Sequence, residues 1–269
     1  MKTLLIKAAG LTDQGKVRSN NEDALWVDEE RGLLIVADGM GGHQAGEVAS
    51  GLAIESIPVT LNELGRTGAT EQLIDENLSA ETNRLGISMR VANQTIFETG
   101  KRYPQSHGMG TTCTAALITN NRLSVAHVGD SRCYLIRRGH MEQLTQDHSL
   151  VMEQVRQGLL SKDDEAVQAA QNILTRSLGT EPTVKIDLDE HPLLPGDVVL
   201  LCSDGLGKEI NDDEILRIAE ETPEPGVLVK RLVDTANSAG GRDNITVAVA
   251  RLDKAGLGET IKSFFKAPR

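Results

Sequence analysis

The chain has 269 residues, a formal net charge of −11, and 39% hydrophobic but only 2% aromatic residues. This acidity excludes a broad nucleic-acid-binding surface, because such surfaces neutralise phosphates with lysine and arginine. The sequence shows neither the roughly 18 consecutive apolar residues of a membrane span nor the apolar segment of a signal peptide, so we expect a cytoplasmic protein without a membrane span.

The N-terminal part combines a strand with a polar loop. Residues 6–27 begin as a short strand and continue through a loop that crowds Arg18, Asn21, Glu22 and Asp23. Taken alone, this loop is typical of a solvated turn.

A hairpin predicted over residues 25–36 leads into the stretch 33–42, which has the sequence Leu-Leu-Ile-Val-Ala-Asp-Gly-Met-Gly-Gly. An apolar run bounded by turn residues predicts a buried strand, with Asp38 at its end. The glycines that follow let the backbone approach a ligand closely. A carboxylate in this place is poorly solvated, and a hard cation with oxygen ligands would balance its charge. A turn aspartate that closes a hairpin is the alternative.

Two helical segments follow. Residues 43–64 carry apolar side chains at helical spacing, and Pro58 is expected to kink or restart that helix. A second helix is predicted over residues 78–96, where an apolar residue recurs every three or four positions. Both helices are expected to pack against a sheet and to carry no chemistry.

Beyond these helices the pattern changes to strands. Residues 111–119 and 123–128 predict a hairpin that turns at Asn120-Asn121, and residues 133–137 predict a further strand. Consecutive strands joined by tight turns form an antiparallel sheet, which excludes a Rossmann-like fold.

The C-terminal part returns to helices before a last strand. Residues 149–178 contain two polar helical pieces that could fold over a site as a flap. Further helices are predicted over residues 212–219 and 225–238, and the last core strand over residues 245–252. The tail, residues 254–269, is expected to be a loosely docked or mobile end.

The pairing of an aspartate with an apolar run recurs along the chain. Asp130 and Asp204 each follow such a run, and Asp243 precedes one. Together with Asp38, these aspartates could converge on one edge of a sheet. Their carboxylates would repel one another, so convergence would require a metal cluster.

The three cysteines, Cys113, Cys133 and Cys202, each lie in an apolar, strand-like stretch and form no C-x-x-C pair. An odd number of such residues is typical of free thiols in a reducing cytoplasm. We expect them to fill the core rather than to act as nucleophiles.

Seven short motifs stand in order along the chain. They are Arg-Ser-Asn-Asn-Glu-Asp (18–23), Val-Ala-Asp-Gly-Met-Gly-Gly-His (36–43), Gly-Met-Gly-Thr-Thr (108–112), Val-Gly-Asp-Ser-Arg (128–132), Leu-Thr-Gln-Asp-His-Ser (144–149), Cys-Ser-Asp-Gly-Leu (202–206) and Gly-Arg-Asp-Asn-Ile-Thr (241–246). Each motif alone is weak. In this order, over nearly the whole chain, they resemble the type 2C, metal-dependent Ser/Thr protein phosphatases (the PPM family) in their compact bacterial form.

The resemblance implies an α+β fold. Two packed antiparallel β-sheets would form a β-sandwich, flanked by α-helices on both sides. A single phosphatase catalytic domain would span residues 1–253, with a flap over about residues 149–180, and the tail 254–269 would follow it.

The resemblance also implies a site at one end of the sandwich that holds two Mn²⁺ or Mg²⁺ ions, with room for a third. Asp38 would bridge the first two ions. The backbone carbonyl of Gly39 would bind one of them, and Asp204 and Asp243 would bind the other. Asp130 matches the position that helps Asp204 to bind a weaker third ion.

Three residues of the first motif would complete the site. By the same resemblance, Arg18 would clamp the substrate phosphate, Glu22 would hold a water that is bound to a metal, and Asp23 would support the loop. A guanidinium is a planar fork that matches phosphate oxygens. Oxygen ligands suit Mg²⁺ and Mn²⁺, and such ions lower the pKa of a bridging water. Direct attack by a metal-bridging hydroxide would need neither a phosphoenzyme nor a cysteine.

One position departs from many eukaryotic members, in which a histidine directly after Asp-Gly is the proposed general acid. Here that position is Met40, which cannot donate a proton. His43 is a candidate replacement, and it is equally a candidate for a helix-start residue without a catalytic part. A metal-bound water is a third candidate. For His148, near the flap entrance, we expect a structural hydrogen bond.

The sequence therefore predicts a monomeric signalling enzyme that hydrolyses phosphoserine and phosphothreonine in proteins. Its partners would be phosphorylated proteins and a cognate bacterial Ser/Thr kinase, with no nucleic-acid partner. Two alternatives are a catalytically weak regulator that binds phosphoproteins and a hydrolase for a small phosphorylated metabolite. The complete set of metal carboxylates counts against the first alternative.

Overall fold

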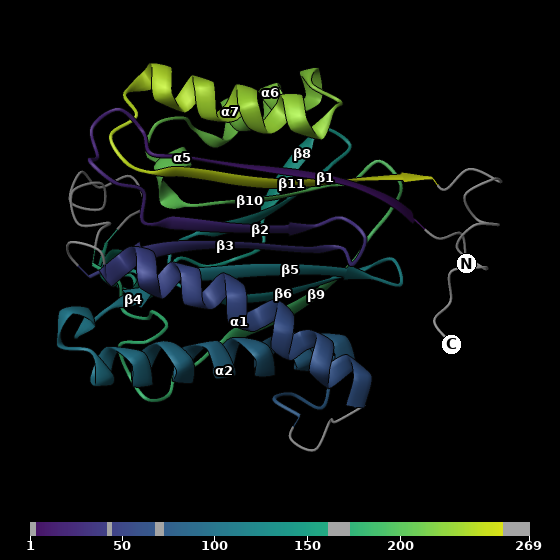
Figure 1. The fold of residues 1–269 in the computed structure, drawn as a ribbon. Helices are drawn as coiled ribbons and strands as arrows, with labels where there is room; N and C mark the ends of the chain where they lie inside the picture. Colours follow the sequence, from purple (N-terminus) through teal and green to yellow (C-terminus); the bar gives the residue numbers. More distant parts are fainter. Residues whose placement is uncertain (1–3, 42–44, 68–72, 161–172, 255–269) are drawn as a thin grey trace.

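The computed structural model describes residues 4–41, 45–67, 73–160 and 173–254. Two sheets stack face to face in the middle of the molecule, and helices cover the outer face of each sheet (Figure 1). This four-layer arrangement confirms the predicted α+β sandwich.

One sheet has five strands in the order β1-β11-β10-β7-β8, and the other has six, in the order β2-β3-β5-β6-β9 with β4 paired to β3. The five are β1 (Leu4–Asp13), β11 (Ile245–Lys254), β10 (Val198–Cys202), β7 (Arg132–Arg137) and β8 (His140–Gln143). The six are β2 (Asp23–Asp28), β3 (Leu33–Met40), β5 (Cys113–Thr119), β6 (Arg122–Val128), β9 (Asp187–Pro192) and β4 (Gly110–Thr111). Neighbouring strands in both sheets run antiparallel, as predicted.

Two pairs of helices cover the sheets (Figure 1). The six-stranded sheet carries α1 (Ala45–Thr67) and α2 (Ala80–Arg102), and the five-stranded sheet carries α6 (Asp212–Glu221) and α7 (Pro225–Ala239). The shorter pieces are α3 (Leu150–Arg156), α5 (Asp204–Gly207) and η1 (Pro104–Ser106). None of the described helices is long and apolar enough to cross a membrane.

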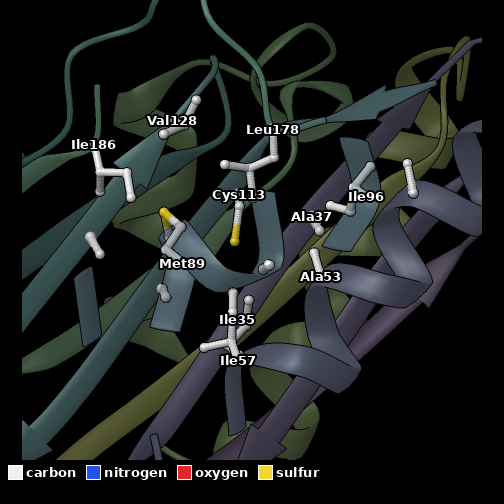
Figure 2. Close-up of a cluster of buried hydrophobic side chains, with 14 of the residues drawn as sticks. Ile35, Ala37, Ala53, Ile57, Met89, Ile96, Cys113, Val128, Leu178 and Ile186 are labelled. Carbon is white, nitrogen blue, oxygen red and sulfur yellow. The ribbon is translucent and has the colours of Figure 1, made fainter. Parts of the chain in front are cut away.

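Apolar clusters fill the three spaces between the four layers. Side chains alternate along a strand, so β3 serves two clusters at once. Leu34 and Val36 pack between the sheets. Ile35 and Ala37 face the helices and pack beside Ile57 of α1 (Figure 2). Burial on both faces is why this strand has a continuous apolar run rather than an alternating one.

The predicted hairpin of residues 111–128 is confirmed at its turn. Asn120 and Asn121 both have positive φ, 51° and 60°, and they join β5 to β6. Asparagine tolerates this left-handed conformation, which two-residue hairpin turns require. The next strand, β7, does not extend the same sheet, because it crosses over and pairs with β10 and β8.

Pro58 was predicted to kink or restart the first helix, and the structure excludes the restart. α1 is one helix with Pro58 inside it. Ala53 and Ile57 before the proline and Leu61 after it pack into the same apolar cluster. This shared packing outweighs the hydrogen bond that proline cannot donate.

The predicted flap is described in part. α3 forms its first helical piece, and the Ser149 side chain caps that helix by accepting from the Met152 N–H. One isolated bridge ties Ser149 to Leu174 and so joins the two ends of the flap, and another ties Leu178 to Thr111 of β4. Residues 161–172 of the flap and residues 255–269 of the tail lie outside the described residues.

Candidate active site

A cavity of about 1220 Å³ opens at the end of the sandwich where β4, α5 and the start of α1 lie (Figure 1). Strand β3 of the six-stranded sheet lines it, together with α5 and the loops that flank β1 and β11 of the five-stranded sheet. The lining includes every described residue for which the sequence predicts a metal or phosphate contact: Arg18, Glu22, Asp38, Gly39, Asp130, Asp204 and Asp243. The structure therefore brings together four aspartates that are far apart in the sequence.

Asp38 was expected at the end of its strand and lies within β3, two residues before the end. The reason is that β3 pairs with β5 only up to Val36 and continues beside β4. Asp38 stands at the break between these two ladders. Its N–H donates to Thr112 Oγ1 at 3.0 Å, and its carbonyl accepts from Thr111 Oγ1 at 2.9 Å. The backbone that carries this carboxylate is therefore fixed on two sides.

Gly39 is a point of close approach between β3, the polar loop and α1. Its N–H donates to the Glu22 carbonyl at 3.1 Å. A Cβ at this position would lie 2.1 Å from the carbonyl oxygen of Gly46 and 2.6 Å from that of Glu22. The position therefore requires glycine for space, whatever its dihedral angles.

Asp204 and Asp243 come from neighbouring strands of the five-stranded sheet. Asp204 begins α5 just after β10, and Asp243 lies two residues before β11. Asn244 links this side of the cavity to the polar loop. The Glu22 N–H donates to Asn244 Oδ1 at 2.9 Å, and Asn244 Nδ2 donates to the Asn20 carbonyl at 2.9 Å.

Two cationic side chains pair with these two carboxylates. Arg18 Nη2 lies 2.8 Å from Asp243 Oδ1. Lys208 Nζ lies 3.1 Å from Asp243 Oδ2 and also contacts Asp204 Oδ2. Lys208 was not predicted as a site residue. The available signal in the sequence was its position four residues after Asp204.

Several carboxyl groups in and beside the cavity have raised pKa values. Burial, and then the charges of Asp23, Asp204, Asp130 and Asp243, raise the pKa of Asp38 well above its ordinary value. Burial also raises the pKa of Asp23 and of Asp130, each to about 7. Carboxylates that raise one another's pKa mark a cluster whose negative charge exceeds the positive charge beside it.

This chemistry fits a hard divalent cation. The donors are carboxylate and carbonyl oxygens, which Mg²⁺ and Mn²⁺ prefer. Within the described residues, Asp204 Oδ1 is buried without a hydrogen-bond partner, a costly state that a bound cation would relieve. In the same part of the chain, no three Asp, Glu, His or Cys side chains already stand close enough to hold a metal ion.

Asp130 lies in the loop between β6 and β7, and His148 holds this loop in place. The Gly129 N–H donates to His148 Nδ1 at 3.0 Å, and the His148 N–H donates to the Gly129 carbonyl at 2.7 Å. Because Nδ1 accepts, Nε2 carries the proton and donates to Asp187 Oδ2 at 3.0 Å. His148 thus makes structural hydrogen bonds, as the sequence predicted.

The remaining sequence candidates are Met40, His43 and the cysteines. Met40 lines the cavity and has no proton to donate, and His43 lies outside the described residues. All three cysteines are buried and free. Burial raises the pKa of Cys202 to about 12 and raises the pKa of Cys113 and Cys133 as well. Such thiols are inert fillers of the core.

Comparison with known proteins places these features in a family. The family model described as Protein phosphatase 2C matches residues 14–241. The chain is 37% identical over 259 residues to the serine/threonine protein phosphatase PstP of Mycobacterium tuberculosis. The aligned region covers 96% of this chain and 47% of that protein. The chain thus spans about half the length of that relative. It is also 37% identical over 245 residues to the serine/threonine phosphatase stp of Listeria monocytogenes, covering 90% of this chain and 94% of the Listeria protein.

Solved structures show the same fold. The crystal structure of Mycobacterium tuberculosis PstP has a TM-score of 0.81 at 36% sequence identity, covering 93% of this chain and 100% of that chain. A crystal structure of the PstP catalytic domain in complex with two manganese ions has a TM-score of 0.79 at 37% identity, with the same coverage.

Proposed function

The chain belongs to the protein phosphatase 2C family, and from this premise we propose that it is a metal-dependent phosphatase for phosphoserine and phosphothreonine in proteins. The observation that carries the proposal is the meeting of four aspartates and one arginine in a single cavity. A phosphate monoester is an oxygen-rich dianion, and its hydrolysis needs charge neutralisation and an activated water. An acidic cluster recruits the cations that provide both.

The substrates would be proteins phosphorylated by a cognate Ser/Thr kinase, and the enzyme would act as a monomer in the cytoplasm. The names of the curated relatives, which are serine/threonine phosphatases, support this class of substrate. The large open cavity also suits a phosphate that is presented on a protein surface.

Two Mn²⁺ or Mg²⁺ ions would occupy the cavity. Asp38 would bridge them, the Gly39 carbonyl would bind one, and Asp204 and Asp243 would bind the other. When bound, the ions supply a water of lowered pKa and neutralise phosphate charge. Glu22 would hold a water at this site. The two manganese ions in the PstP complex support the proposed number of two metal ions.

A third, weaker ion is the finer part of the proposal. Asp130 and Asp204 line both the main cavity and an adjoining one of about 610 Å³. Burial and the charge of Asp204 raise the pKa of Asp130, and a cation near both carboxylates would relieve this repulsion. Counting the ions in crystals grown with Mn²⁺ tests this part.

The departing serine or threonine oxygen needs a proton. No histidine among the described residues lines the main cavity. The proton would therefore come from His43 or from a water in the cavity, and Met40 is excluded.

Substrate comparison tests the function. In the presence of Mn²⁺, kcat/KM for a phosphothreonine peptide should exceed that for a small phosphorylated metabolite by about tenfold or more, because a peptide can also contact the cavity wall at Gln105 and Leu174. It should also exceed kcat/KM for a phosphotyrosine peptide, since the curated relatives are named serine/threonine phosphatases. Phosphate release under steady-state conditions measures the three rates. Preference for the metabolite would replace the proposal with a metabolite hydrolase, and tight phosphopeptide binding without release would replace it with a binding regulator.

Arg18→Ala should raise KM for a phosphopeptide about tenfold while kcat changes less, because a guanidinium fork binds phosphate in the ground state and the transition state alike. Arg18 is half exposed at the cavity and pairs there with Asp243, so it can exchange this partner for a phosphate. Arg217→Ala, on the exposed face of α6, is the matched control. Unchanged KM with a collapsed kcat would instead place the action of Arg18 in the transition state.

A further inference from the structure

Lys208 lies beside the carboxylates of the cavity, and hydrogen bonds to its backbone hold it in this position. It caps the C-terminus of α5, where its N–H donates to the Asp204 carbonyl at 2.9 Å, and its own carbonyl accepts from Arg242 Nη2 at 3.1 Å. Its ammonium contacts Asp204 Oδ2 and lies 3.1 Å from Asp243 Oδ2. One cation of this chain therefore bridges two carboxylates that the proposed function assigns to the same metal ion.

The free oxygens of these carboxylates show what an incoming ion would meet. Asp204 Oδ1 is buried and has no partner among the described residues. Asp243 Oδ1 already accepts from the Asn244 N–H at 3.0 Å and pairs with Arg18 at 2.8 Å. An ion can thus reach Asp204 through an unused oxygen, but it can share Asp243 only by displacing a cation or by binding close beside one.

We propose that Lys208 is the built-in counter-ion of the metal centre: its ammonium holds Asp204 and Asp243 together when no divalent ion is bound, and competes with the ion that these two carboxylates share. The inference rests on the proposed function, since that function makes both residues ligands.

The charges around Lys208 support this role. The Lys208 ammonium contacts Asp204 Oδ2 and lies 3.1 Å from Asp243 Oδ2, with its side chain only 28% exposed. A positive charge therefore stands directly beside both proposed ligands. Two cations held by one pair of carboxylates repel each other strongly in a partly buried cavity, so each should weaken the binding of the other.

The chain offers a matched comparison. Lys230 and Asp234 on α7 form an ion pair at the same four-residue separation, with both side chains largely exposed, 69% and 59%. Lys208 and Asp204 are only 28% and 18% exposed. An exposed pair of this kind contributes little, so removal of Lys230 should change neither metal binding nor stability.

Isothermal titration of the metal-free protein with Mn²⁺ tests the proposal. Lys208→Met keeps most of the length and the apolar character of the side chain but removes its charge. The variant should bind the ion that Asp204 and Asp243 are proposed to share about tenfold more tightly or better, the scale on which one neighbouring charge shifts the proton affinity of a carboxylate. Lys208→Arg should stay close to wild type, and so should Lys230→Met. The metal-free Lys208→Met protein should also melt at a lower temperature than wild type, and saturating Mn²⁺ should recover that loss.

The outcomes separate this inference from the proposed function. If wild type binds Mn²⁺ and Lys208→Met binds it equally or more weakly, Lys208 orients the carboxylates instead. That result refutes the counter-ion role and leaves the proposed function standing. If wild type binds no Mn²⁺, the proposed function and this inference both fail. Lys208→Gln, which is also uncharged, replaces Lys208→Met if the latter does not fold.

Discussion

Asp38→Asn should reduce phosphopeptide turnover by about a thousandfold or more while the protein stays folded. The change keeps the shape of the side chain and removes one negative charge from the carboxylate that is proposed to bridge two ions. Burial and four neighbouring aspartates already disfavour ionisation of Asp38. The metal-free variant should therefore be at least as stable as metal-free wild type, since its side chain no longer resists burial as an anion.

Two measurements check this expectation. Titration with Mn²⁺ should show weakened binding of both ions, and thermal melting in chelator should show a melting temperature equal to or above that of wild type. Asp253→Asn, at an exposed ion pair on β11, is the control that should leave both quantities unchanged. If Asp38→Asn bound two ions with wild-type affinity, Asp38 would not be the bridge.

Much of the fold was predictable because its signals are local. The Asn120-Asn121 turn is specified by the two residues that adopt positive φ, and the apolar run of β3 reflects burial on both faces of one strand. Helix α2 begins directly after Ser79, whose side chain accepts from the Thr82 N–H. Each of these features depends on residues within a few positions of one another.

The pairing of strands was not predictable in the same way. Leu4 of β1 lies opposite Lys254 of β11, near the two ends of the described chain. Strand β7 leaves the sheet of β6 although the two are consecutive. Strands buried on both faces have similar apolar runs, so nothing in a run specifies its partner. The continuity of α1 through Pro58 likewise depends on packing that only the folded chain provides.

In the candidate site, the ordered motifs selected the aspartates that the fold then brings into one cavity. Asn244 was part of a quoted motif, but its link to Glu22 crosses 222 positions and becomes visible only in the structure. Lys208 was missed for a different reason. A lysine four residues after an aspartate is usually a surface ion pair, and its second partner, Asp243, comes from another strand.

Removal of divalent ions should abolish turnover and lower the melting temperature, and the loss of stability should grow as pH rises. Chelation leaves the buried carboxylates without the cations that would balance them. In the protein alone, burial raises the pKa of Asp23 and Asp130 to about 7, from an ordinary value of 3.8. Between these values the folded state binds more protons than the unfolded state, so stability is fully present below about pH 4 and is lost as pH rises toward about 7.

A bound ion should flatten this dependence, because it replaces the protons as the source of positive charge. The difference in melting temperature between the Mn²⁺-loaded and the chelated protein should therefore widen from pH 5 to about pH 7 and level off by pH 8. Thermal melting at four pH values in each condition, with activity assayed on the same samples, measures both effects. A difference that stays constant with pH would mean that the ions bind away from these carboxylates. Full activity after verified removal of metal would refute the metal-dependent mechanism itself, because no described cysteine or cavity histidine stands ready to supply an alternative nucleophile.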